Sequence, residues 1–179
     1  MPTAQLLVGV LSSSLIAGIL GALIGGWFTL RGKRNDYANE YYKVVLARRV
    51  QAYEEVERLI NMVKTAVLDQ DGRPYHVLFC KDDDKQGVYD LLIAVMSKAL
   101  WLSDELFELI RTFNLLLYSL GDAEGGLIEF GKENYKQIAE LRTKIEKVHL
   151  RDMLILHEVP RFLKSKSPTD SYGVIKIPG

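Results

Sequence analysis

His76 and Cys80 are the residues of this chain whose types and spacing could support nucleophilic chemistry, four positions apart in a short apolar segment. On an extended strand both side chains would face the same side. A cysteine nucleophile needs a base within reach, but the chain has only three histidines and one cysteine, and no glycine elbow precedes Cys80. We therefore predict a buried structural cysteine beside a loop histidine, with no catalytic residue.

One candidate for metal chemistry is the set His149, Asp152 and His157, which share a predicted helix. Two histidines that hold one ion from a single helix are three or four positions apart. His149 and His157 are eight positions apart, which is too far to share an ion directly. Asp152 is spaced to pair with His149 at the surface or an interface. A second set imitates a calcium loop but has Ile93 where that loop needs a glutamate; it contains Asp82, Asp84, Gln86, Gly87 and Asp90. The sequence therefore predicts neither a metal site nor a cofactor.

A candidate surface for a ligand or a partner is formed by Arg73, Tyr75 and His76, in and beside the apolar segment 75–80. If a small-ligand or nucleotide sensor is encoded here, these residues are the place for its pocket. The glycines of the later chain match neither a phosphate-binding loop nor a dinucleotide fingerprint. No nucleotide-specific motif supports that hypothesis.

The composition is that of a folded protein. The chain has 179 residues, is 48% hydrophobic and 26% charged, and carries 23 basic and 23 acidic side chains. The single cysteine excludes an intramolecular disulfide. A formal net charge of zero gives no reason to expect nucleic acid as a partner.

The charged residues are absent from the first thirty positions. The stretch Leu6–Leu30 is 25 residues long without one charge, and a helix of that length rises about 37 Å. That exceeds a hydrocarbon core of about 30 Å and predicts a transmembrane helix over 6–30. A cleaved signal peptide would need a basic start, and residues 1–5 contain no basic side chain.

The flanks of this apolar stretch predict its orientation. Arg31, Lys33 and Arg34 follow it directly, and Trp27 lies where aromatic rings favour a membrane interface. The positive-inside rule then places the N-terminus outside and the rest in the cytoplasm. We expect a single-pass protein of the inner (cytoplasmic) membrane, in contact with the lipid bilayer.

Small residues recur at every fourth position of the same stretch. Such rows let two helix backbones approach closely, as in a glycine zipper. We therefore expect a homo-oligomer that assembles through two adjoining rows, which together contain Ser14, Ala17, Gly18, Gly21, Ala22, Gly25 and Gly26.

The remaining chain has the periodicity of an all-α protein. Apolar residues at three- and four-residue steps predict a long amphipathic helix after the membrane helix, followed by a cytoplasmic helical bundle. Ser103, followed by Asp104 and Glu105, favours a new helix start. We predict a bundle over 31–159 and a flexible tail over 160–179, with helices at about 35–67, 88–101, 104–119 and 128–158.

Three motifs suggest a family. Arg49-Val-Gln-Ala-Tyr-Glu, Arg73-Pro-Tyr-His and Trp101-Leu-Ser-Asp-Glu appear in this order behind the apolar stretch and its basic stop. In this the chain resembles a loosely defined group of uncharacterised short bacterial single-pass membrane-anchored helical proteins. The resemblance implies architecture and a bacterial source. It implies no chemistry, because its motifs are packing and capping residues.

The leading hypothesis is a non-enzymatic membrane-anchored helical module that self-associates or binds a protein partner at the cytoplasmic face. The first alternative is a membrane-acting effector, pore-forming or depolarising, that is triggered through its cytoplasmic domain, for example in phage defence. The second alternative is the small-ligand or nucleotide sensor at Arg73, Tyr75 and His76.

Overall fold

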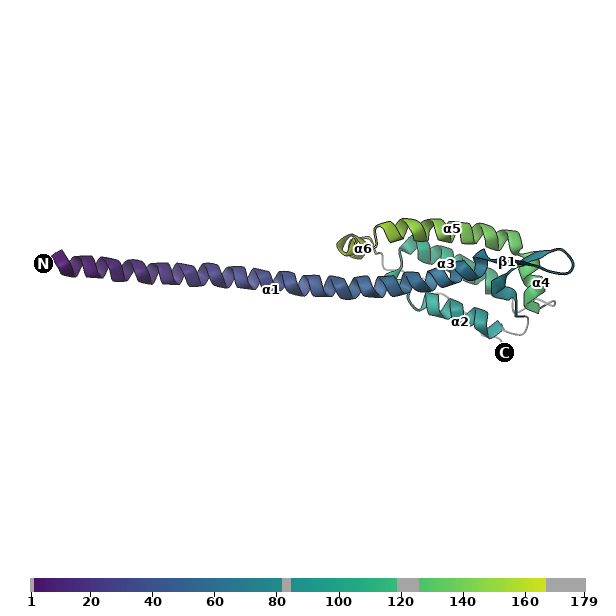
Figure 1. Cartoon of the computed structure of the whole chain (residues 1–179), viewed down its shortest axis with the longest axis horizontal. Helices are drawn as coiled ribbons and strands as arrows, with labels where there is room; N and C mark the ends of the chain where they lie inside the picture. Colours follow the sequence, from purple (N-terminus) through teal and green to yellow (C-terminus); the bar gives the residue numbers. More distant parts are fainter. Residues whose placement is uncertain (1, 82–84, 119–125, 167–179) are drawn as a thin grey trace. The chain divides into compact units, whose positions relative to one another are not determined.

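A computed structural model describes residues 2–81, 85–118 and 126–166, with side chains from residue 21 onward. The described residues are mostly helical, which confirms the all-α prediction (Figure 1). In chain order they form α1 (Pro2–Lys64), β1 (Ala66–Leu68), β2 (Pro74–His76), the 3-10 turn η1 (Val77–Phe79), α2 (Lys85–Met96), the 3-10 turn η2 (Ala99–Trp101), α3 (Asp104–Tyr118), α4 (Gly126–Glu133), α5 (Tyr135–Leu154) and α6 (Val159–Ser165).

The chain divides into two compact units, 1–44 and 45–179. Helix α1 supplies residues to both. The first unit is the N-terminal part of α1, and the second is a helical bundle with a small hairpin.

The predicted membrane span over 6–30 is contradicted. In the described part of the chain, no helix combines the length and the hydropathy that crossing a bilayer requires. The prediction of an inner-membrane protein with its N-terminus outside is therefore wrong. The effector hypothesis depended on the same span.

α1 ends at Lys64, three residues before the predicted helix end, and a short hairpin follows it. Ala66 pairs with His76, and Leu68 with Pro74, in an antiparallel register. Gly72 lies in the connecting turn at a φ of 79°, a left-handed conformation that glycine adopts at low cost. The hairpin places Tyr75 and His76 against the bundle, where both are buried.

The core of the bundle lies between the C-terminal part of α1 and helices α2, α3 and α5. In Figure 1, α5 and α2 lie on opposite sides of this part of α1, and α3 packs along α5. Burial of apolar side chains along these helices is the main force that holds them together. Fully buried members of this core are Val56, Leu59, Leu92, Leu106, Ile110, Phe113, Leu117 and Ile138, whereas Trp101 and Leu109 pack against it only partly buried.

The last predicted helix is divided in two. α4 ends at Glu133 and α5 begins at Tyr135, with Asn134 between them. Pro160 was expected to close the helix, but it lies in the first turn of α6, where a missing N–H costs nothing. Residues 160–165 of the expected tail are thus helical, and 167–179 lie outside the described residues.

Candidate functional site

Arg73, Tyr75 and His76 do not form one open surface. Arg73 is exposed and forms ion pairs with Asp71 at 2.9 Å and with Glu129 at 2.7 Å. Tyr75 and His76 point into the bundle instead and are buried. The proposed ligand surface at these residues stays a prediction, with only Arg73 accessible.

The His76 imidazole is a packing group of the hairpin. Its ring stacks on Tyr135 at 4.6 Å between centroids, and its Nε2 lies 3.2 Å from the Tyr135 carbonyl oxygen. Burial lowers the pKa of His76, because the protonated ring would lose its hydration. This contact fixes β2 against the start of α5.

A cluster of ions joins the hairpin turn to α4. Lys132 Nζ contacts the carboxylates of Asp69 and Asp71, the latter at 2.9 Å, although the Lys132 side chain is only 6% exposed. Hydrogen bonds from the Arg73 backbone N–H and from Lys132 hold the pKa of Asp71 well below its usual value. The same carboxylates raise the pKa of Lys132. The cluster is an electrostatic clasp between two elements.

A buried polar network connects α1, α3 and α5. The Tyr53 hydroxyl donates to Asp152 Oδ2 at 3.0 Å, and Ser103 Oγ donates to the same oxygen. His149 Nε2 lies 3.2 Å from the Tyr53 carbonyl oxygen. His149 and Asp152 are both buried, so the surface position that the sequence allowed for this pair is wrong. His157 is exposed and stays apart from them.

Arg49 is a second buried polar group that the sequence did not reveal. Its side chain donates to the Leu156 carbonyl at 2.7 Å, near the C-terminus of α5. The guanidinium also lies over the Phe162 ring of α6, 4.0 Å from its centroid, as a cation–π contact. Arg49 therefore fastens α5 and α6 to α1. A cavity of about 60 Å³ lies beside Arg49, Ser103 and Asp152.

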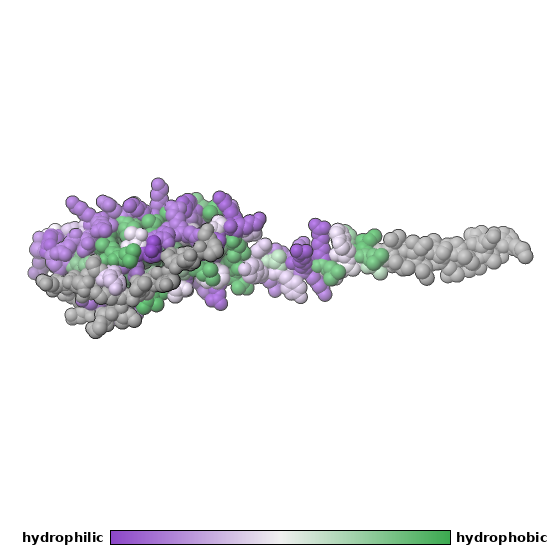
Figure 2. All heavy atoms as spheres, turned by 180° about the vertical axis from the view of Figure 1, so that it is seen from behind, coloured by the Kyte–Doolittle hydropathy of each residue, from purple (hydrophilic) through white to green (hydrophobic). Residues whose placement is uncertain are grey.

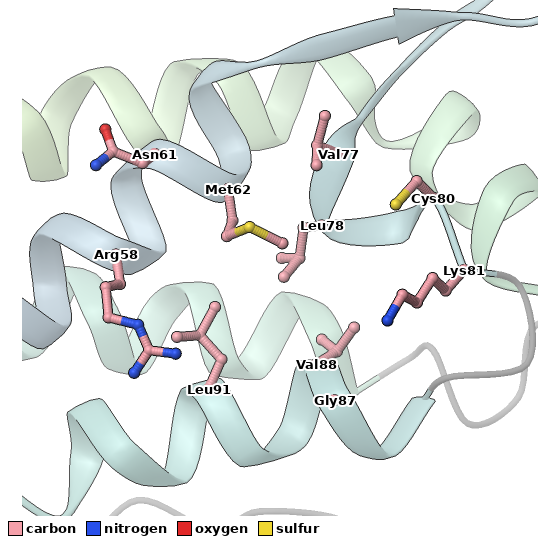
Figure 3. A pocket seen from close by; sticks show the side chains of 10 residues that line it. All are labelled: Arg58, Asn61, Met62, Val77, Leu78, Cys80, Lys81, Gly87, Val88 and Leu91. Carbon is pink, nitrogen blue, oxygen red and sulfur yellow. The ribbon is translucent and has the colours of Figure 1, made fainter.

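Cys80 is exposed, not buried as predicted, and borders a pocket of the bundle of about 350 Å³. Figure 3 shows α1 on one side of this pocket and α2 on the other, with η1 and Cys80 closing it. The described residues contain no group of three or more His, Cys, Asp or Glu side chains that could hold a metal ion. The residues lining the pocket are Arg58, Asn61, Met62, Val77, Leu78, Cys80, Lys81, Gly87, Val88 and Leu91.

The predicted oligomerisation rows are described only in part. The side chains of Ser14, Ala17 and Gly18 lie outside the described residues. Ala22 is exposed, and a Cβ added at Gly21, Gly25 or Gly26 would meet nothing within 4 Å. These rows are open to a neighbour and stay a prediction.

The residues predicted at a membrane interface are all exposed on α1. Trp27 packs edge-on against Phe28, with centroids 5.3 Å apart, and Arg31 lies 5.4 Å from the Trp27 ring centroid. Lys33 and Arg34 are exposed without a described ion pair in this part of α1. These contacts are local ones within a single helix.

Apart from Ile24 and Phe28, the exposed large apolar side chains described in the first unit follow a heptad. From Leu23 to Val44 they recur at alternating steps of four and three residues, the spacing of a and d positions in a coiled coil. Each is between 55 and 73% exposed. Figure 2 shows green, hydrophobic atoms on this part of α1. We call this set the heptad stripe; it contains Leu23, Trp27, Leu30, Tyr37, Tyr41 and Val44, with Arg34 as its one polar member.

No family model, curated protein or solved structure matches this chain.

Proposed function

We propose that this protein is a non-enzymatic assembly module, in which copies of the chain associate through the heptad stripe of α1. The helical bundle of the second unit is then the part that association gathers and that binds a protein partner. The observation that supports this is the run of large apolar side chains left exposed at heptad spacing between Leu23 and Val44.

A second copy is the partner that fits the stripe best. Spacing of 3.5 residues matches a helix of the same pitch, because a and d side chains interdigitate with those of a like helix. The stripe spans about three heptads, the length at which such a pattern favours a coiled coil. An α-helix has 3.6 residues per turn, so a stripe that repeats every seven residues rotates about 20° around the helix axis per heptad. All seven positions therefore stay on one face. Arg34 in the middle can fix the register, as single polar a positions do.

The row that contains Gly21 and Gly25 offers a different contact surface on the same helix, whereas Gly26 lies within about 60° of Leu23 and Leu30. Gly21 and Gly25 are each two residues from a stripe position, which is about 200° around the helix axis. They therefore face away from Leu23 and Trp27. Association through the glycine rows and association through the stripe make opposite predictions for substitutions at these positions.

The absence of catalysis is part of the proposal. Asp152, His149 and His76 each contact groups of other elements in the bundle interior. Polar side chains used in this way stabilise one arrangement of helices. Partner binding is favoured over chemistry because these groups are committed to packing contacts.

The test is sedimentation equilibrium of the full-length protein with neighbouring tyrosines replaced. Tyr41 lies on the stripe and Tyr42 beside it, with ring centroids 6.0 Å apart. Tyr41→Glu should raise the self-dissociation constant at least about tenfold, because a charge would enter the apolar seam. Tyr42→Glu should leave it within about threefold. A Gly21→Ile variant that dissociates while Tyr41→Glu does not would overturn the stripe in favour of the glycine rows.

A further inference from the structure

The pocket between α1, η1 and α2 has the size of a ligand site. Its volume of about 350 Å³ lies within the range of small-molecule pockets, roughly 300–1,000 Å³. α1 contributes Met62 to the wall, η1 contributes Leu78, and α2 contributes Leu91 (Figure 3). Such a wall suits an apolar body.

The polar groups of the same pocket have one sign of charge. Arg58 and Lys81 are among its ten lining residues, and none of the ten is Asp or Glu. Asn61 adds an amide that can donate a hydrogen bond. In Figure 3, Arg58 and Lys81 lie at opposite ends of the pocket with Leu91 and Leu78 between them, which suits a molecule that has an apolar body and an anionic group.

Arg58 can exchange its present partner for a ligand. Its guanidinium pairs with Glu55 one turn away at 2.8 Å, and the Arg58 side chain is 68% exposed. Exposed pairs at this spacing contribute at most about 1 kcal/mol. An anion seated in the pocket therefore competes with a weak contact.

We infer that this pocket binds a small anionic amphiphile, with its apolar body against Met62, Leu78 and Leu91 and its anionic group at Arg58. The inference goes beyond the proposed assembly function and does not depend on it. The bundle would then bind, and so sense, a metabolite or signal molecule of this class.

Cys80 makes the pocket directly measurable, because it is the only cysteine of the chain and lines the wall. The experiment follows the rate at which N-ethylmaleimide, a neutral reagent, modifies Cys80 in the full-length protein. The probe is 8-anilino-1-naphthalenesulfonate. Its neutral counterpart, N-phenyl-1-naphthylamine, lacks only the sulfonate. At ten times its Kd, the anionic probe should slow modification about tenfold.

Charge is tested by comparing the two probes. Arg58→Gln should raise the Kd of the sulfonate about threefold and leave that of the neutral amine unchanged. The sequence continues from Lys81 into three aspartates, so dodecyltrimethylammonium serves as a cationic probe. If the cationic or the neutral probe protects Cys80 better than the sulfonate does, the anionic assignment is overturned.

Location is tested by filling the pocket. Met62 lines it and is exposed, so Met62→Trp can occupy it without disturbing the core. This variant should lose protection of Cys80 by the sulfonate. Leu115→Trp, at an exposed apolar position on α3, is the matched control and should keep it. Sulfonate fluorescence without protection of Cys80, or protection that survives Met62→Trp, would overturn the site.

Discussion

Tyr53 of α1 and Asp152 of α5, 99 positions apart, are joined by a hydrogen bond of 3.0 Å in the interior of the bundle. Both residues are at most 3% exposed. Burial, together with the neighbouring Asp152 carboxylate, raises the pKa of Tyr53, so its hydroxyl stays a donor. Ser103 donates to the same carboxylate and brings the start of α3 to the same point.

Replacing Asp152 should therefore destabilise the bundle strongly. Asp152→Ala leaves the hydroxyls of Tyr53 and Ser103 without their acceptor, and such losses cost about 1–3 kcal/mol for each buried group. We expect the free energy of unfolding in urea to fall by about 2–4 kcal/mol. Asp90→Ala, on the exposed side of α2, is the control and should change it by less than about 0.5 kcal/mol. A loss for Asp152→Ala as small as that of the control would contradict the network.

A close approach between η1 and α4 depends on Gly131. A Cβ added at Gly131 would lie 2.9 Å from Phe79 Cδ2, and Phe79 is fully buried. Gly131→Ala should thus lower the free energy of unfolding by about 1–3 kcal/mol through overpacking. Phe79→Ala removes two of the three contacting atoms, Cγ and Cδ2, so adding it to Gly131→Ala should cost less than the sum of the two single changes. If the two losses of unfolding free energy simply add, the contact between positions 131 and 79 is not what destabilises Gly131→Ala.

Acid should loosen the clasp between the hairpin and α4. The folded pKa of Asp71 is lowered, so the folded state takes up its proton later than the unfolded state, whose value is about 3.8. The stabilisation by Asp71 is complete above that value and is lost as the pH falls below it. We expect the urea midpoint to drop between pH 5 and pH 3, and to drop less in Asp71→Asn. Equal drops in both proteins would argue against the clasp.

His76 should add a second pH dependence at milder acidity. Burial lowers its folded pKa, so the unfolded chain binds the proton first, near pH 6.5. Stability from neutral His76 is present above that value and is lost as the pH falls through it. In His76→Phe, which keeps a ring against Tyr135, the urea midpoint should change less between pH 7.5 and pH 5.5. If the urea midpoint of His76→Phe changes with pH as much as that of the unchanged protein, His76 has the same pKa in the folded and the unfolded state.

The sequence allowed the helices to be predicted where their signals are local. Ser103 before Asp104 marked the start of α3, and Ser103 Oγ indeed accepts the Leu106 N–H at 3.2 Å. The hairpin was not predicted, because strands of three residues leave no periodic pattern. The register of the hairpin is fixed by how its two strands pair across the turn.

The polar interior could not be predicted, because its partners are far apart in the chain. Arg49 meets Leu156 over 107 positions, and nothing in either segment indicates the other. The heptad stripe was visible in the sequence as steps of three and four from Leu23 onward. It was not recognised because the apolar run that contains its first members was interpreted as a membrane span.

Disulfide crosslinking at Arg34 tests association through the stripe most directly. Arg34 lies at the middle of the stripe, so two copies bring their 34 positions together in a parallel and in a centred antiparallel pair. In a Cys80→Ser background, Arg34→Cys should form disulfide-linked dimers under mild oxidation, because paired a positions lie within disulfide reach. Asn35→Cys, also at an exposed position but off the stripe, should form few. Equal crosslinking at both positions, or none at Arg34→Cys, would contradict self-association through the stripe.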